Sequence, residues 1–411
     1  MKTKLAKLLS GNILAQAIPL LALPFLARLY SLEEFGFFAF YVAICSMGSL
    51  SSAGRYDVAI IAATRASHKS LLARLSLMMI ALAALVALVA SGILYQLAIV
   101  SLDWLVLLPA GIVGVALFNL SNNLRNDQEA YGKLTLNVTS RSIVWVAVSL
   151  GLHEYQLGLL IAFALSYWFV ALINAINIRQ RVVATPFNSR LLRAVAQRYR
   201  QYPLFNAPHA LLTSANLNIP NLFLPAFGHT ALLGAYSQAN KALVTPWQLI
   251  ANALFKIYFK TTATRIDNQQ PVLPAFRKFL TVYAIGLLPV FVAGFWLVEP
   301  FMLLLLGEEW AVAGKIGVML LPWIYMRAVG GILAFVPLIL SMQRAAFLYE
   351  IAYSICMAAC MGVSLWLLTP LQSIGLFALL GASFVLIQVI WYLLAVVKHD
   401  NSLTLSGSRH L

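Results

Sequence analysis

Four basic residues lie inside long apolar stretches of the sequence, where a charge is costly. Lys241 and Arg327 are each about ten residues from the nearest polar break, roughly 15 Å deep in a helix that rises 1.5 Å per residue. Arg55 and Arg141 lie nearer to the ends of their stretches. A charged side chain that faces lipid costs at least about 2.5 kcal/mol, so such residues normally face a wet cavity or a partner. The four residues therefore predict a site that binds an anion.

Carboxylates are scarce in the same stretches. Asp57 and Glu350 are the main ones, since Glu299 lies toward the outer side, and Glu350 is close to the start of its stretch. A carrier of cations would need carboxylates at mid-depth, so this pattern disfavours cationic cargo. Asp57, His209 and Glu350 are candidates for carrying a coupling proton or sodium ion, although each also has an ordinary structural explanation.

Polar residues at helical spacing extend the predicted site. Ser237, Lys241, Thr245 and Gln248 share one face of a helix, and so do His209, Thr213 and Asn216. The residues predicted to line the outer part of a cavity are Arg28, Asn12, Gln16, Asn216 and Gln248. Seams of hydrogen bonds between helices are the alternative interpretation of these stripes.

Other kinds of chemistry find little support. Cys45, Cys356 and Cys360 sit in apolar runs without further metal ligands nearby, and we expect them to be small residues of the core. No loop holds a nucleophile with a base, and no G-x-x-x-x-G-K-[ST] phosphate loop occurs. The sequence therefore predicts no metal, no cofactor and no enzymatic activity.

The composition indicates the elements that position these residues. The 411-residue chain is 62% hydrophobic and only 10% charged, against about 25% charged residues in a soluble chain. Its net charge of +15 is carried by no solvated face that could bind nucleic acid. A membrane-spanning helix needs roughly 20 apolar residues. Such stretches predict twelve spans, at about 8–29, 36–61, 71–97, 104–124, 134–152, 155–178, 203–226, 231–256, 277–304, 316–341, 346–368 and 372–397.

The distribution of Lys and Arg predicts the topology. Basic residues recur in every second loop and at both ends of the chain, which places both termini in the cytoplasm. Prolines predict interruptions of the first, seventh and eighth spans, at Pro19, Pro24, Pro208, Pro220 and Pro246. We expect an all-α integral membrane protein with two parallel six-helix lobes around a central cavity. The predicted parts are 1–178, a basic cytoplasmic linker 179–202, 203–397 and a cytoplasmic tail 398–411.

Several motifs resemble those of one family. Residues 54–60 (GRYDVAI) are similar to the G-R-Y-(D/E)-x-A-I signature of Wzx-type polysaccharide flippases, of the multidrug/oligosaccharidyl-lipid/polysaccharide exporter superfamily. Residues 24–31 (PFLARLYS) with 34–36 (EFG), and 202–205 (YPLF) with 234–241 (GAYSQANK), resemble further blocks of that family. Each motif is short, but together they occur in order and at consistent topology.

The resemblance implies a flippase of the bacterial inner membrane. Its cargo would be a polyprenyl-pyrophosphate-linked oligosaccharide for O-antigen, capsule or a related surface polysaccharide, moved by alternating access. Arg55, Arg141, Lys241 and Arg327 would hold the diphosphate, and the outer residues would receive the glycan. Expected partners are the lipid-linked oligosaccharide, membrane lipid, and a polymerase with chain-length machinery around a monomeric flippase, without nucleic acid. The alternatives are a multidrug or cation antiporter of the same superfamily, and a polysaccharide polymerase or ligase.

Overall fold

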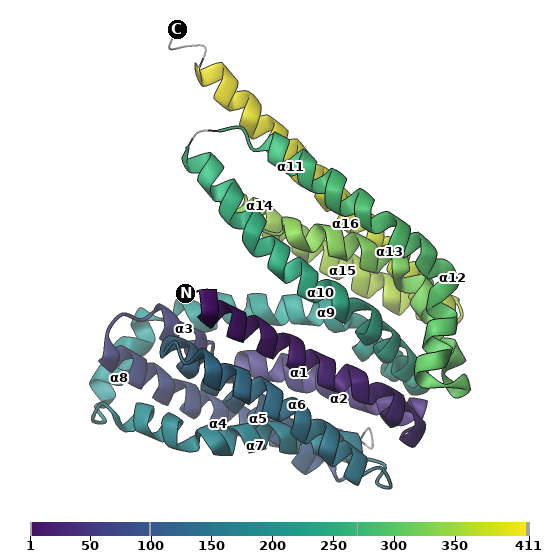
Figure 1. The fold of residues 1–411 in the computed structure, drawn as a ribbon. Coiled ribbons are helices and arrows are strands. Elements are labelled where there is room, and N and C mark those ends of the chain that lie inside the picture. The colour runs from purple at the N-terminus through teal and green to yellow at the C-terminus, as the bar shows by residue number, and fades with distance from the viewer. Residues whose placement is uncertain (1, 98–99, 269, 408–411) are drawn as a thin grey trace. The chain divides into compact units, whose positions relative to one another are not determined.

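The protein is helical throughout the part that the structure describes. The computed structural model describes residues 2–97, 100–268 and 270–407, and contains no strand within them (Figure 1). The chain divides into two compact units, Met1–Pro225 and Ala226–Leu411. The all-α fold predicted from the composition is confirmed.

The first unit begins with α1, contains a broken second span, and ends on a π-helical turn and a long helix. Its elements are α1 (Lys2–Leu29), α2 (Leu32–Ser52), α3 (Tyr56–Ala62), α4 (Ala66–Gln96), α5 (Trp104–Asp127), α6 (Tyr131–Gly151), α7 (Gly158–Val183), α8 (Ser189–Arg198), the π-helix η1 (Tyr202–Asn206) and α9 (Ala207–Ala226). The unit boundary follows Pro225, one helix later than the predicted linker 179–202. The assignment of α9 to a second six-helix lobe stays a prediction.

The second unit contains the remaining spans. Its elements are α10 (Thr230–Asp267), α11 (Leu273–Phe279), the π-helix η2 (Leu280–Ile285), α12 (Gly286–Leu306), the 3-10 turn η3 (Glu308–Trp310), α13 (Ala311–Leu333), α14 (Val336–Ile339), α15 (Gln343–Leu367) and α16 (Pro370–Gly407). Together with the first unit, these elements account for each of the twelve predicted spans in order.

The helices differ in how apolar they are. Eight segments of the described residues are long and apolar enough to cross a membrane by length and composition. The helices α6, α9 and α10 are not among them, and α9 and α10 carry the polar stripes noted in the sequence. Polar faces of spanning helices normally lie against other helices or line a wet cavity rather than face lipid.

The two units repeat one packing pattern. In the first unit α5 packs on α2, α4 and α7, and α6 packs on α7. In the second unit α13 packs on α10, α12 and α16, and α15 packs on α16. Counted in spans, the second set is the first set moved by six. This correspondence is the structural form of the parallel repeat predicted from the sequence.

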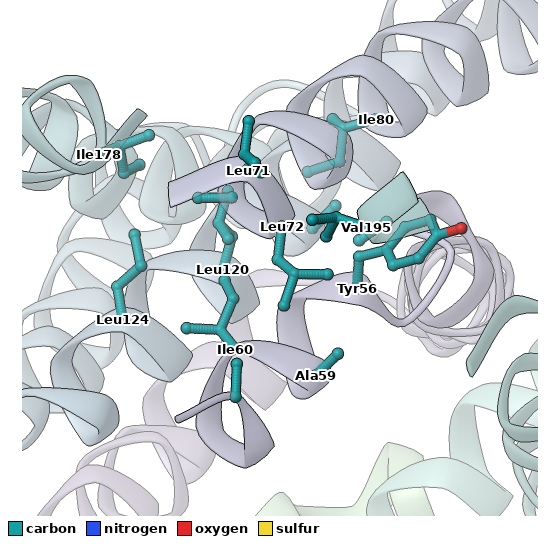
Figure 2. Packing of buried hydrophobic residues seen from close by; sticks show 14 of the residues in the cluster. Tyr56, Ala59, Ile60, Leu71, Leu72, Ile80, Leu120, Leu124, Ile178 and Val195 are labelled. Atoms are coloured by element: carbon teal, nitrogen blue, oxygen red, sulfur yellow. The ribbon is translucent and has the colours of Figure 1, made fainter. Parts of the chain in front are cut away.

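A hydrophobic core fixes the short helix α3 in the first unit. Ile60 and Ala59 of α3 pack with Leu71 and Leu72 of α4 and with Leu120 of α5, all of them buried (Figure 2). The amphipathic helix α8 adds its apolar face, through Leu192 and Val195, to the same core. Asn188 caps α8 by accepting hydrogen bonds from the backbone N–H groups of Arg190 and Leu191 at 3.0 and 3.1 Å.

Two sequence predictions are wrong. The predicted interruptions do not occur at four prolines, since α1 runs through Pro19 and Pro24, α9 through Pro220 and α10 through Pro246. Pro208 lies at the start of α9, directly after the π-helix η1. A proline removes one backbone donor, which neighbouring groups in a helical bundle can compensate. The expected core position of all three cysteines fails for Cys356, which is exposed, whereas Cys45 is buried.

Candidate anion-binding site

The second span breaks where the family-like signature begins. Gly54 and Arg55 both adopt the left-handed conformation, with φ of 57° at each, between the end of α2 and the start of α3. Glycine tolerates this conformation, but an L-residue such as Arg55 is rarely found there. The buried residues Tyr56 and Asp57 follow directly and anchor α3 in the core. The break therefore presents Arg55 at the end of a fixed helix.

Arg55 makes a single hydrogen bond within the described part of the chain. Its Nε–H donates to Oδ1 of Asn206, in η1, at 2.9 Å. The two terminal amino groups of its guanidinium have no hydrogen bond or ion pair with any residue that the structure describes. Arg55 is therefore a half-buried cation whose terminal amino groups have hydrogen-bond donors available for a ligand.

Asp57 is the carboxylate closest in sequence to Arg55. It is only 5% exposed, and its Oδ2 accepts a hydrogen bond from Nδ2 of Asn123 in α5 at 2.9 Å. The interactions found among the described residues include no ion pair between Asp57 and Arg55. The charge of Arg55 is therefore not neutralised by a direct contact with this carboxylate.

Arg141 lies among aromatic side chains inside the first unit. Its guanidinium carbon is 5.1 Å from the ring centre of Tyr167 in α7 and 5.9 Å from that of Phe118 in α5. Its terminal amino groups donate to the Tyr167 hydroxyl at 3.5 Å and the Ser142 hydroxyl at 3.3 Å. Cation–π contacts hold the group without removing its charge. Side chains of α5 and α7 therefore enclose Arg141, which its position in the sequence did not indicate.

Arg327 has a similar aromatic support in the second unit. Its guanidinium carbon lies 4.7 Å from the ring centre of Trp323, one turn earlier in α13. Tyr236 of α10 and Tyr353 of α15 are within its electrostatic range, and Tyr353 is also within range of Glu350. Tyr353 is therefore influenced by charges from two helices, Arg327 of α13 and Glu350 of α15.

The remaining predicted residues fall into three groups. Arg28, Gln248 and His209 are exposed, at the end of α1, on α10 and near the start of α9. Lys241 and Gln16 are half-buried, and Asn216 is buried in α9. The side chain of Asn12 lies outside the described residues. Because Arg55 and Arg141 belong to one unit and Lys241 and Arg327 to the other, their convergence on one ligand stays a prediction.

A hydrogen-bonded series of asparagine side chains was not predicted from the sequence. Arg125 Nε donates to Asn174, Asn174 Nδ2 donates to Asn137, and Asn137 Nδ2 donates to Asn122, at 3.0, 2.9 and 2.9 Å. This series ties α5, α6 and α7 together, with Asn137 and Asn174 buried. The signal that could have revealed it is the amides themselves, which are costly inside apolar stretches unless they bond to one another.

A carboxylate at the end of α5 was also missed. Asp127 forms ion pairs with Lys69 at the start of α4 and with Arg181 at the end of α7. Its side chain is largely buried, whereas the two cations are partly exposed. The described residues contain no group of three or more His, Cys, Asp or Glu side chains that could hold a metal ion. The charged clusters of this unit therefore tie helices together.

Comparisons with known proteins agree with one another. A family model described as polysaccharide biosynthesis protein matches residues 25–315. No curated protein matches the chain in sequence at a significant level. A structure of the lipid II flippase MurJ in an inward closed conformation is similar with a TM-score of 0.70 and 12% identity, over 98% of this chain and 90% of that one.

Two further solved structures extend the likeness. A MATE protein in complex with MaL6 matches with a TM-score of 0.60 and 12% identity, over 97% of each chain. A MOP superfamily transporter from Pyrococcus furiosus, described as having a binding pocket of reverse polarity, matches with a TM-score of 0.57 and 13% identity, over 98% of this chain and 96% of that one. At these identities, the likeness establishes a shared fold.

Proposed function

The chain belongs to the family of polysaccharide biosynthesis proteins, and from this premise we propose that it is a flippase for lipid-linked oligosaccharides. The cargo is an oligosaccharide joined through a diphosphate to a polyprenyl chain. The protein moves it across the bacterial inner membrane by alternating access, for assembly of a surface polysaccharide such as O-antigen or capsule. It acts as a carrier and not as an enzyme.

The observation that carries the proposal is the set of basic side chains inside the spans. Arg55, Arg141, Lys241 and Arg327 lie in four predicted spans that together hold one carboxylate, Asp57. A diphosphate cannot cross hydrocarbon unaided, because removing its charges from water costs far more than apolar contacts return. Guanidinium and ammonium groups replace the lost water with charge-assisted hydrogen bonds. The polyprenyl chain needs no such help and remains in lipid.

The other predicted residues have supporting roles in this proposal. Arg28, Asn12, Gln16, Asn216 and Gln248 receive the diphosphate or the glycan on the outer side, through hydroxyl and phosphate contacts. Asp57, His209 and Glu350 are the candidates for a coupling proton or sodium ion. The cation antiporter, the alternative from the same superfamily, would need carboxylates at mid-depth in its spans, where Lys241 and Arg327 lie instead.

Deletion of the gene in its host tests the proposal. We expect loss of the surface polysaccharide and accumulation of lipid-linked repeat units on the cytoplasmic face, restored by the wild-type gene. Lipid-linked units that still reach the outer face at the wild-type rate would contradict it. Accumulation of unpolymerised units on the outer face would instead indicate a polymerase or ligase.

A further inference from the structure

We propose that Asn206 is a positioning residue that orients the Arg55 guanidinium so that both of its terminal amino groups can bind the diphosphate. This inference rests on the proposed function and adds to it an uncharged residue, which is not one of the four predicted diphosphate-binding residues. Asn206 closes the π-helical turn η1, directly before α9. It is far from Arg55 in sequence and reaches it through one side-chain bond.

The geometry of the bond determines which donors remain. A guanidinium has five N–H donors in one plane, one at Nε and four on the terminal amino groups. The bond from Nε to Oδ1 of Asn206, at 2.9 Å, uses the single donor on the side of the stem. The four terminal donors keep the fork arrangement that matches two oxygens of a phosphate group. Asn206 therefore fixes the plane of the group without occupying its binding edge.

The chemical type of residue 206 is as important as its position. An amide oxygen accepts the Nε–H bond while carrying no net charge, so Arg55 keeps its full positive charge for an anion. A carboxylate in the same place would accept the same bond more strongly, but it would neutralise the cation. The neutral amide of Asn206 thus orients the Arg55 guanidinium without compensating its charge. Asp57 lies within electrostatic range of Arg55 but makes no ion pair with it among the described residues, so the terminal amino groups of Arg55 keep their donors for the ligand.

Both ends of the bond are anchored to the same core. Tyr56, next to Arg55, is buried in the cluster that holds α3. Tyr202, at the start of η1, and Tyr199 pack against that cluster from the linker side, and α3 contacts η1. Because Arg55 and Asn206 are both held by this core, the Arg55 guanidinium loses little conformational freedom when it binds a ligand, which favours affinity. The left-handed backbone of Arg55 adds to this fixed arrangement.

The test is a binding measurement on the purified full-length protein in nanodiscs of neutral phosphatidylcholine, with farnesyl diphosphate as the probe. We expect Asn206→Asp to weaken binding by at least tenfold, since the new carboxylate competes for Arg55. Asn206→Ala should weaken it by about three- to tenfold, since the charge remains but the orientation is lost. Gln201→Glu, an equal charge change at an exposed neighbouring residue, should alter it by less than twofold.

The order of the two variants separates positioning from a structural role. If Asn206 had only a structural role, Asn206→Asp would weaken probe binding less than Asn206→Ala does. Aspartate would still accept the hydrogen bond from Arg55, and the melting temperature of the protein would stay unchanged. Weaker binding by Asn206→Ala than by Asn206→Asp, or wild-type binding by both, would therefore overturn the inference.

Two further arms identify the source of any failure. If wild-type protein does not bind farnesyl diphosphate and the deletion strain exports lipid-linked units at the wild-type rate, the proposed function fails with the inference. If wild-type protein binds the probe and Arg55→Ala does not, but Asn206→Asp still does, the inference alone fails. Nanodiscs with phosphatidylglycerol test a lipid headgroup as the ligand. Stabilisation by that lipid, lost in Asn206→Asp while probe affinity is unchanged, would assign Arg55 to the bilayer and overturn the inference.

Discussion

Arg327 stacks on Trp323 and keeps its positive charge within a largely apolar helix. We expect Arg327→Ala to reduce export of lipid-linked units by at least tenfold while the protein stays in the membrane, because the diphosphate would lose a charged contact. Lys315→Ala is the matched control, since Lys315 lies on the same helix and is exposed near its end. Surface polysaccharide and immunoblots of membrane fractions measure the two effects. Normal export by Arg327→Ala would remove this residue from the site.

Asp127 has a different expected effect, on stability. Asp127→Asn leaves Lys69 and Arg181 without their shared carboxylate, between the ends of α4, α5 and α7. Removing one partner of a buried pair costs about 3–5 kcal/mol, and the partial exposure of both cations reduces this to about 1–3 kcal/mol here. Thermal unfolding in detergent should show a lower midpoint. Asp103→Asn, at an exposed site, should leave the midpoint unchanged; equal midpoints for both variants would contradict the bridging role.

Some residues of the site could be predicted from the sequence, and others could not. Arg55 and Arg327 were identifiable because a charge in an apolar stretch is conspicuous whatever its surroundings. Asn206 and Asn123 act through partners far along the chain, so only the fold gives them a role. Arg141 was correctly placed in a span, but its aromatic neighbours Phe118 and Tyr167 come from other helices.

The break between α2 and α3 depends on glycine at residue 54. An alanine Cβ there would lie 3.2 Å from a ring carbon of Tyr56, in a backbone conformation with φ of 57°. We expect Gly54→Ala to destabilise the protein by about 1–2 kcal/mol and to move Arg55, which should weaken farnesyl diphosphate binding as well. Thermal unfolding and the binding assay measure both.

The matched control for this break is Gly132→Ala in α6. Nothing lies within 4 Å of the added Cβ, and the residue is helical. Alanine should therefore leave stability unchanged or raise it by about 0.5–1 kcal/mol, with normal binding. A Gly54→Ala protein as stable as the Gly132→Ala protein would show that the left-handed turn is not required.

The sequence pattern misplaced the irregular elements for a physical reason. Prolines such as Pro19 and Pro246 are visible markers of helix breaks, yet surrounding helices tolerate them. The actual break at Gly54–Arg55 and the π-helical turn η1 depend on contacts with the α3 core, which no local pattern specifies.

The topology of the whole molecule is predicted from its charge asymmetry and is open to a direct test. In a Cys356→Ala background, we expect Tyr155→Cys to react with an impermeant maleimide in intact spheroplasts. Phe187→Cys should react only after permeabilisation, because the basic segment around it is predicted to be cytoplasmic. Both side chains are exposed, at 63% and 67%, so access itself is not limiting. Labelling of Phe187→Cys in intact spheroplasts would reverse the predicted orientation.

At this scale the sequence was most informative. Twelve apolar stretches predicted twelve spans in two parallel lobes, and the packing of α5 and α13 against corresponding helices agrees with them. The number of spans depends on the composition of long stretches, so an error at a few residues does not change it. The boundary between the units depends on a few contacts of α9 and was not predictable in the same way.

The polar character of α6, α9 and α10 also has a consequence for biosynthesis. A segment too polar to partition into lipid alone must leave the translocon together with a more apolar neighbour. In the first unit α6 packs extensively on α1, made earlier, and on α7, made just after it. We therefore expect α7 to assist membrane integration of α6, so in a chain truncated between them a larger share of α6 should stay outside the bilayer, exposed to membrane proteases.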